Sequence, residues 1–253
     1  MTAYQLLAAD EPKAFTELNR GGRSSFVIAV DHASNRIPKR LCNLGLTAEV
    51  LERHIAWDIG AREVAARVST LLDAPLVVQN YSRLVIDCNR DPGVDTSVPQ
   101  MSEETPIPGN LDITAEQLAA RRAEIFEPYH AAIQCLLDER LAANRPAILV
   151  AQHSMTNVFK GVSRDMHAAI LYNRDRRFAG RILDALRDEP GLHVADNQPY
   201  FVSDETDYTI PRHAEARGLL HIAIEIRQDL ILDEAGQVQW AQRIAAALIK
   251  ANG

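Results

Sequence analysis

Residues 25–38 read SFVIAVDHASNRIP, and this stretch decides the fold that we expect for the chain. The apolar run FVIAV predicts a buried strand, which ends where Asp31 and His32 begin a polar loop. The pattern recurs where AILVAQ leads into His153 and where LLHIAIEI carries Glu225 near its end. Ligands of open α/β sheets bind just beyond the C-terminal ends of the strands. Two histidines and a glutamate at such ends therefore predict one polar cluster at the rim of a sheet, with the composition of a metal-assisted hydrolase.

The composition indicates an ordinary globular protein. A chain of 253 residues is long enough to bury a large core, and we expect residues 1–253 to form a single domain. A net charge of −7 argues against a nucleic-acid binder, because phosphate binding requires a basic face. The three widely spaced cysteines predict reduced thiols and a cytoplasmic location. No stretch is apolar enough to span a bilayer, and no basic region followed by an apolar one begins the sequence, so we expect no membrane partner.

Apolar strand-like runs alternate with helical patterns along the chain, which predicts an α/β fold. The expected strands lie near residues 25–31, 75–79, 83–88, 146–152, 167–172, 192–195 and 221–227. The expected helices cover residues 47–72, a stretch that starts at Thr114, and residues near 175–188 and 237–251.

Local signals mark the helix ends and the loops. Gly60 is a weak point in the first expected helix, and Pro128 predicts an interruption of the second. Thr114 and Gln117 fit a capping box at the start of that second helix. Two long loops, 91–110 and 196–214, are rich in acidic residues and proline, and we expect them to fold over the sheet rim.

His32 and His153 are the first candidate metal ligands. Each could cap a strand end by hydrogen bonding, but their matching positions favour zinc ligation by neutral imidazole. Asn35 and Asp58 compete as the third protein ligand that a zinc site needs. Asn35 lies three residues after His32, although an amide oxygen is a poor zinc ligand.

Asp58 lies in the motif HIAWDIGA, and helical spacing places it on the core side of the first expected helix. A buried carboxylate must be paired, protonated or bound to a metal. Metal ligation and a salt bridge to an arginine such as Arg62 or Arg36 both remain open.

Glu225 lies inside the expected core strand HIAIEIRQDL. Strand alternation places it on the face opposite the isoleucines of that strand. A glutamate at such a position is costly without a partner or a function. An ion pair with Arg227 or another arginine would satisfy it, whereas the interpretation that we favour is a general base. In that role it takes a proton from metal-bound water and delivers it to the leaving amine.

The segment YSRLVIDCNRDP, residues 81–92, contains arginines suited to an anionic substrate. Arginine binds carboxylates through two parallel hydrogen bonds, so Arg83 and Arg90 at a metal-bearing rim are candidates for that contact. Composition alone favours the alternative, in which they pair with acidic neighbours such as Asp87 and Asp91.

Several segments together resemble the N-formylglutamate amidohydrolase family. They follow in the order expected of that family, as DHASNRIP (31–38), HIAWDIGA (54–61), YSRLVIDCNR (81–90), QHSM (152–155), LYNRD (171–175) and IEIRQDL (224–230). That family is in turn similar to zinc carboxypeptidases and related deacylases. The resemblance implies a three-layer α/β/α fold with a mixed central sheet, zinc-carboxypeptidase-like (phosphorylase/hydrolase-like). It also implies an amidohydrolase of amino-acid degradation. Such an enzyme cleaves an N-acyl acidic amino acid such as N-formyl-L-glutamate to formate and glutamate.

The resemblance further implies roles for individual residues. His32 and His153 match the two zinc histidines of the carboxypeptidases, and Glu225 matches their catalytic glutamate. Their glutamate ligand would fall at Asn35, so Asp58 becomes the expected third ligand. The expected cofactor is Zn²⁺, with another divalent metal as the alternative.

The expected partner is a small anionic acyl-amino acid. Its carboxylate would be held by Asn89 and Arg90, which resemble the Asn-Arg pair of the carboxypeptidases, and by Arg83. In the second long loop we expect further contacts from Tyr200, Tyr208 and His213. Two alternatives remain open. One is a metallo-amidase or peptidase for another acyl group. The other is a metal-free anion-binding relative, which would explain an asparagine at position 35 in place of a metal ligand.

Overall fold

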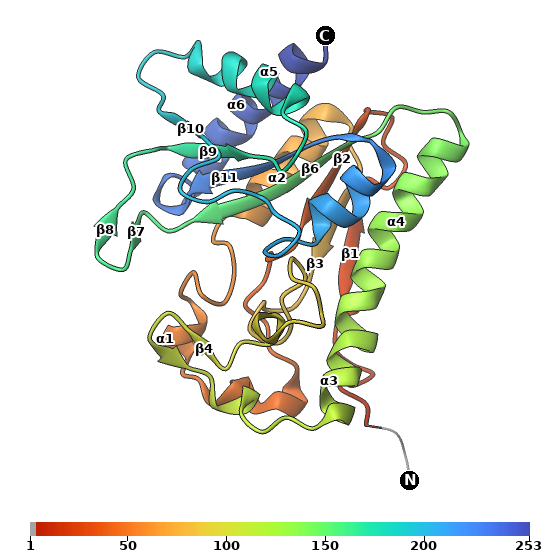
Figure 1. The fold of residues 1–253 in the computed structure, drawn as a ribbon, viewed down its shortest axis with the longest axis vertical. Coiled ribbons are helices and arrows are strands. Elements are labelled where there is room, and N and C mark those ends of the chain that lie inside the picture. The colour runs from red at the N-terminus through yellow and green to blue at the C-terminus, as the bar shows by residue number, and fades with distance from the viewer. Residues whose placement is uncertain (1–3) are drawn as a thin grey trace.

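The computed structural model describes residues 4–253, and a seven-stranded mixed sheet forms its centre (Figure 1). Strands β3, β2, β6 and β11 are parallel to one another, whereas β1 and β9 run antiparallel to β3 and β11, and β10 is parallel to β9. In their spatial order the strands are β1 Phe15–Leu18, β3 Leu76–Gln79, β2 Phe26–Val30, β6 Ile148–Met155, β11 Leu220–Arg227, β9 Ala168–Leu171 and β10 Val194–Asp196. The mixed central sheet expected from the sequence is therefore confirmed.

Helices cover both faces of this sheet and complete the three layers. Helices α2, α5 and α6 pack on one face, and α4 lies against the other, along the right of Figure 1. The helices are α1 Ala48–Leu51, α2 Ala61–Leu72, α3 Ala115–Arg121, α4 Glu127–Ala142, α5 Arg177–Arg187 and α6 Glu234–Asn252. Among residues 4–253, none of the helices combines the length and the apolar character needed to cross a membrane.

Shorter elements lie in the connections. Two hairpins pair β4 with β5 and β7 with β8. Their strands are β4 Met101–Ser102, β5 Thr105–Pro106, β7 Val158–Phe159 and β8 Val162–Ser163. The 3-10 helices are η1 Lys39–Gly45 (kinked), η2 Asp95–Ser97, η3 Pro108–Asn110, η6 Glu215–Arg217 and η7 Gln228–Leu230, and the π-helices are η4 Arg122–Phe126 and η5 Ile210–Ala214.

The single helix predicted over residues 47–72 is wrong, because a turn separates α1 from α2. Gly60 directs the chain into α2 with a φ of +76°, a conformation that favours glycine. A Cβ atom at this position would lie 2.4 Å from the carbonyl oxygen of Ile231. Asp58 therefore belongs to the turn before α2 and not to a helix face.

The strand predicted over residues 83–88 is also wrong. The Asn110 side chain donates to the Leu84 carbonyl (2.8 Å), and the Arg121 guanidinium donates to the Val85 carbonyl (2.9 Å). Polar side chains therefore satisfy these buried backbone groups in place of a neighbouring strand. Conversely, β1 is a short, half-buried edge strand without a long apolar run, so the hydrophobic pattern of the sequence does not predict it.

The predicted capping box is confirmed at the start of α3. Thr114 Oγ1 accepts from the Gln117 N–H (3.2 Å), and Gln117 Oε1 accepts from the Thr114 N–H (2.9 Å). The helix then widens into η4 just before Pro128, which has no N–H to donate, and it continues as α4. The start of α4 packs on the face of the sheet that carries the candidate site.

Candidate metal centre

The C-terminal ends of β2, β6 and β11 lie side by side and bring the main predicted site residues together. His153 on β6 is in register with Glu225 on β11, and β2 pairs with the other side of β6 and ends just before Asp31. Strand alternation directs these side chains to the face of the sheet that α4 covers. The position of the site at the rim thus follows from three separate apolar runs that form adjacent parallel strands of the mixed sheet.

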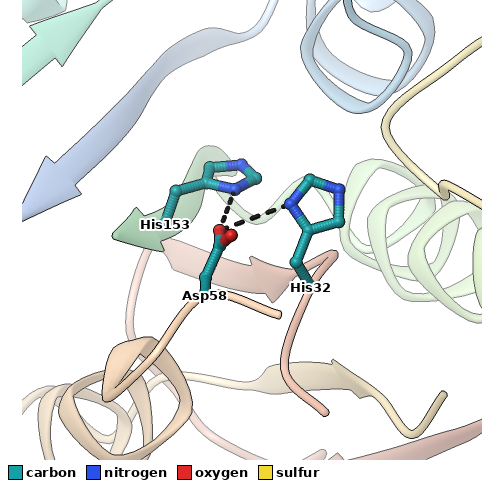
Figure 2. A group of neighbouring side chains, drawn as sticks. All are labelled: His32, Asp58 and His153. Atoms are coloured by element: carbon teal, nitrogen blue, oxygen red, sulfur yellow. Dashed lines mark hydrogen bonds and ion pairs between the residues drawn. The ribbon is translucent and has the colours of Figure 1, made fainter. Parts of the chain in front are cut away.

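His32, Asp58 and His153 form a compact buried triad (Figure 2). Asp58 Oδ2 lies 3.3 Å from His32 Nδ1 and 2.8 Å from His153 Nδ1. One ligand atom from each residue lies within 4.8 Å of the other two. The Asp58 N–H donates to the His32 carbonyl (2.8 Å), which fixes the turn before α2 to the end of β2. Asn35, the competing third ligand, instead donates its amide to the Leu51 carbonyl (3.1 Å).

A second carboxylate lies behind each imidazole. Asp87 Oδ1 is 2.7 Å from His32 Nε2, and Asp31 Oδ2 is 3.4 Å from His153 Nε2. Metal-ligating histidines commonly direct their second ring nitrogen to such a carboxylate, which fixes the ring orientation. Neither role was predicted from the sequence. The sequence does contain a signal for these roles, since Asp31 directly precedes His32 and Asp87 lies in the arginine-containing segment 81–92.

The buried carboxylates create an excess of negative charge. Asp31, Asp58 and Asp87 are all buried, and the Arg83 guanidinium contacts two of them. Its Nη2 lies 2.6 Å from Asp87 Oδ2, and its Nη1 lies 3.8 Å from Asp58 Oδ1. Burial disfavours the charged carboxylates, yet the imidazoles hold the pKa of Asp31 and of Asp58 below the ordinary value, and Arg83 together with His32 does the same for Asp87. Burial likewise opposes charged imidazoles, but the carboxylates raise the pKa of both. Positive charge at the triad, carried by imidazolium groups or by a bound cation, offsets the charge of these carboxylates.

Glu225 stands beside the triad without an ion-pair partner. Its Oε2 is buried and makes no hydrogen bond within residues 4–253. Arg227, the alternative partner, binds Asp229 (2.8 Å). Burial raises the pKa of Glu225 to about 7. Burial and the Glu225 carboxylate together raise the pKa of the interacting Tyr200 hydroxyl well above its usual value.

Comparison with known proteins assigns the family. The sequence profile of N-formylglutamate amidohydrolase (FGase) matches residues 24–232. The chain belongs to this family. Family membership identifies a hydrolase that acts on amides, and it confirms the resemblance found in the sequence.

Two solved structures share the fold of this family member. Gene product Atu2144 from Agrobacterium tumefaciens is 37% identical, with 98% of both chains covered and a TM-score of 0.95. N-formylglutamate amidohydrolase from Ralstonia eutropha JMP134 is 18% identical, with 95% of this chain and 98% of that chain covered and a TM-score of 0.76. A comparison with curated protein sequences gives no match.

The two arginines expected to bind the substrate have different surroundings in this amidohydrolase. Arg83 binds Asp87 Oδ2 through Nε (3.0 Å) and Nη2 (2.6 Å), the pairing that composition favoured. Arg90 forms no ion pair with any residue in the described part of the chain, and its Nη1 donates to the Asn89 carbonyl (3.2 Å). Arg90 therefore retains donors for an external carboxylate.

Asn89 uses its side-chain amide within the chain. Its Nδ2 donates to Asp207 Oδ1 (2.8 Å), and its Oδ1 accepts from the N–H groups of Tyr208 (3.0 Å) and Thr209 (3.1 Å). These three bonds fix the loop 196–214 to the segment that carries Asp87.

A second histidine pair, His130 and His213, is buried near this segment. His130 Nε2 lies 2.8 Å from the Cys88 carbonyl, which only accepts, so Nε2 carries the proton. His130 Nδ1 then accepts from His213 Nε2 at 2.9 Å. Burial lowers the pKa of His130 to about 4 and that of His213 to about 3. The rings of Phe126 and Tyr208 pack around His130, so Tyr208 and His213 take part in packing and not in the hydrogen bonds of the triad.

The triad lies beneath the protein surface. His32, Asp58 and His153 are only 3%, 4% and 5% exposed, whereas Tyr200 is 39% exposed and also interacts with Glu225. Tyr200 therefore extends from the solvent to the cluster. A separate hollow of about 710 Å³ is lined mainly by residues 204–216, and none of the triad contributes to its wall.

Proposed function

We propose that the chain hydrolyses the amide C–N bond of an N-acyl acidic amino acid, with N-formyl-L-glutamate as the expected substrate and formate and glutamate as products. The observation that supports this proposal is the free, buried carboxylate of Glu225 in register with His153 at the triad. Family membership supports the substrate class. We expect the reaction in the cytoplasm, because all three cysteines are unpaired.

The donor set fits a divalent metal, and zinc in particular. His32, His153 and Asp58 supply the nitrogen and carboxylate ligands that zinc takes in catalytic sites. Asp87 and Asp31 stand at the outer nitrogens of the two imidazoles, as metal-ligating histidines require. The buried carboxylates of the cluster also favour a bound cation. When bound, such an ion polarises the acyl carbonyl and lowers the pKa of a water molecule.

Glu225 moves the proton in this proposal. With a pKa of about 7, its carboxylate accepts a proton from the attacking water near neutral pH and then donates that proton to the leaving amine. A general acid–base group works best when its pKa lies near the working pH. Tyr200 interacts with this carboxylate and is also partly exposed to solvent, so we assign Tyr200 to orienting Glu225 and covering the substrate.

Arg90 is the residue to which we assign the substrate carboxylate. Its free donors suit bidentate binding of a carboxylate, and its charge lies close enough to lower the pKa of Asp87. Arg83 and Asn89 support this site from behind, since Arg83 orients Asp87 and Asn89 fixes the loop that carries Tyr208. His213 supports the same segment through His130.

A substrate series with metal analysis tests the proposal. The purified protein would be assayed for release of the acyl group from N-formyl-, N-acetyl- and N-succinyl-L-glutamate, before and after removal of metal by a chelator. We expect the highest kcat/KM for N-formyl-L-glutamate, loss of activity with the chelator, and recovery with Zn²⁺. Equal activity without metal would contradict the metal assignment, and preference for another acyl group would contradict the substrate assignment.

A further inference from the structure

The two carboxylate oxygens of Asp31 face different partners. Its Oδ2 faces His153 Nε2 at 3.4 Å. Its Oδ1 accepts two hydrogen bonds from hydroxyl groups, from Tyr129 at 2.8 Å and from Thr209 at 2.7 Å. The Asp31 side chain is fully buried, and these two hydroxyls are its hydrogen-bond donors within residues 4–253.

The two hydroxyls come from distant parts of the fold. Tyr129 belongs to the first turn of α4, and Thr209 belongs to the loop 196–214, directly before η5. Both residues are completely buried, so their hydroxyls have a fixed direction. The backbone of Thr209 is itself held by Asn89 Oδ1 at 3.1 Å. The loop therefore contributes a rigid donor to the back of the triad.

A buried carboxylate that loses a donor must rotate, take up a proton or admit water, because an unsatisfied charge is costly. Each of these responses would weaken the contact between Asp31 and His153. We propose that Tyr129 and Thr209 are positioning residues that hold Asp31 against His153 and thereby raise the affinity of the triad for its cation. This inference rests on the metal ligation proposed above, and it adds a role for the loop 196–214.

Zinc affinity, measured without any substrate, tests this inference. Metal-free wild type and variants would compete with a chromophoric chelator for Zn²⁺. Thr209→Val keeps the shape of the side chain and removes its hydroxyl, and Tyr129→Phe does the same at the second site. We expect each to bind Zn²⁺ about 10-fold more weakly, at the lower end of the 10–100-fold cost of losing the outer partner itself, because Asp31 stays in place and keeps its other donor. Thr209→Ser, which retains the hydroxyl, should restore the affinity to within about threefold of wild type.

Tyr81→Phe is a matched control, because the buried Tyr81 hydroxyl donates to the Pro12 carbonyl (2.7 Å), away from the triad. It should bind Zn²⁺ as the wild type does. The inference is overturned if Thr209→Val retains wild-type affinity, or if Thr209→Ser or Tyr81→Phe loses as much as the hydroxyl-free variants. A wild-type protein that binds no Zn²⁺ overturns the proposed metal site itself, so the two failures are distinguishable.

Discussion

Two pairs of buried histidines lie close together in this fold, in opposite surroundings. His32 and His153 lie among carboxylates, whereas His130 and His213 bind each other and a backbone carbonyl among aromatic rings. The carboxylates raise the pKa of the first pair, and burial lowers the pKa of the second. The same residue type is thus a candidate cation-binding group in one place and a neutral packing group in the other.

Residues 87 and 88 join the two pairs. The Asp87 side chain binds His32 Nε2, and the next carbonyl, that of Cys88, accepts from His130 Nε2. His130 and His213 therefore fix the segment 87–88, which orients His32, although neither of these two histidines belongs to the triad. Substitutions in and around the two pairs are expected to affect metal binding, turnover, substrate affinity and acid stability to different extents.

The largest difference is expected in metal binding. His153→Ala removes a proposed ligand and should abolish stoichiometric Zn²⁺ binding and turnover, a loss greater than the roughly 10–100-fold cost of an outer partner. His213→Ala, the matched substitution in the neutral pair, should retain stoichiometric zinc. Metal content after dialysis, with circular dichroism to verify folding, measures both. Equal zinc content in the two variants would remove the distinction between the pairs.

Glu225→Gln should lower kcat by about 10²–10⁴-fold, the range expected for a general acid–base group, because the amide cannot take up the proton of the attacking water. The zinc content should stay at the wild-type level, since Glu225 is not a member of the proposed ligand set. Steady-state kinetics and metal analysis on one preparation give both values. A variant with near-normal kcat would assign Glu225 a structural role.

Arg90→Ala should raise KM by about 10–100-fold, which corresponds to the loss of hydrogen bonds to a charged group. The effect should be larger for N-formyl-L-glutamate than for an N-formyl amino acid with a neutral side chain, while kcat changes little. Arg23→Ala is the control, because Arg23 pairs with Asp73 at the surface, with 91% of its side chain exposed. A uniform change for all substrates would argue against contact with the side-chain carboxylate.

The smallest effect concerns acid stability. Burial lowers the pKa of His213 to about 3, below the 6.5 of an unfolded histidine. Below pH 6.5 the unfolded chain therefore binds a proton that the folded protein does not, and stability is lost as the pH falls toward about 3. His213→Leu should flatten the pH dependence of the free energy of unfolding, by a slope that approaches about 1.4 kcal/mol per pH unit well below pH 6.5. Denaturant unfolding between about pH 7 and pH 5 tests this, and parallel profiles would contradict it.

The sequence predicted the strands that carry the site because their side chains contact the core directly. FVIAV, AILVAQ and LLHIAIEI are long apolar runs, and each lies in a strand of the sheet. The pattern did not predict the path of residues 83–88, because their backbone groups are satisfied by Asn110 and Arg121 from later in the chain. It also placed Asp58 on a helix face, since helical spacing continues through the turn at Gly60.

The outer parts of the site depend on contacts between residues far apart in the chain. Asp31 and Asp87 are visible in the sequence as acidic residues, but their roles depend on which nitrogen of each imidazole faces them. Thr209 reaches Asp31 from 178 positions away, and no local pattern encodes that contact. Asn89 likewise binds a loop more than a hundred residues later.

Hydrophobic periodicity and motif order are local properties of the chain, so they predict the sheet-forming runs, the polar residues at their ends and the family. The tertiary structure alone decided which histidines lie among carboxylates and which lie among aromatic rings. The physical reason is that the charge of an imidazole is set by the groups that surround it after burial, and distant segments supply those groups.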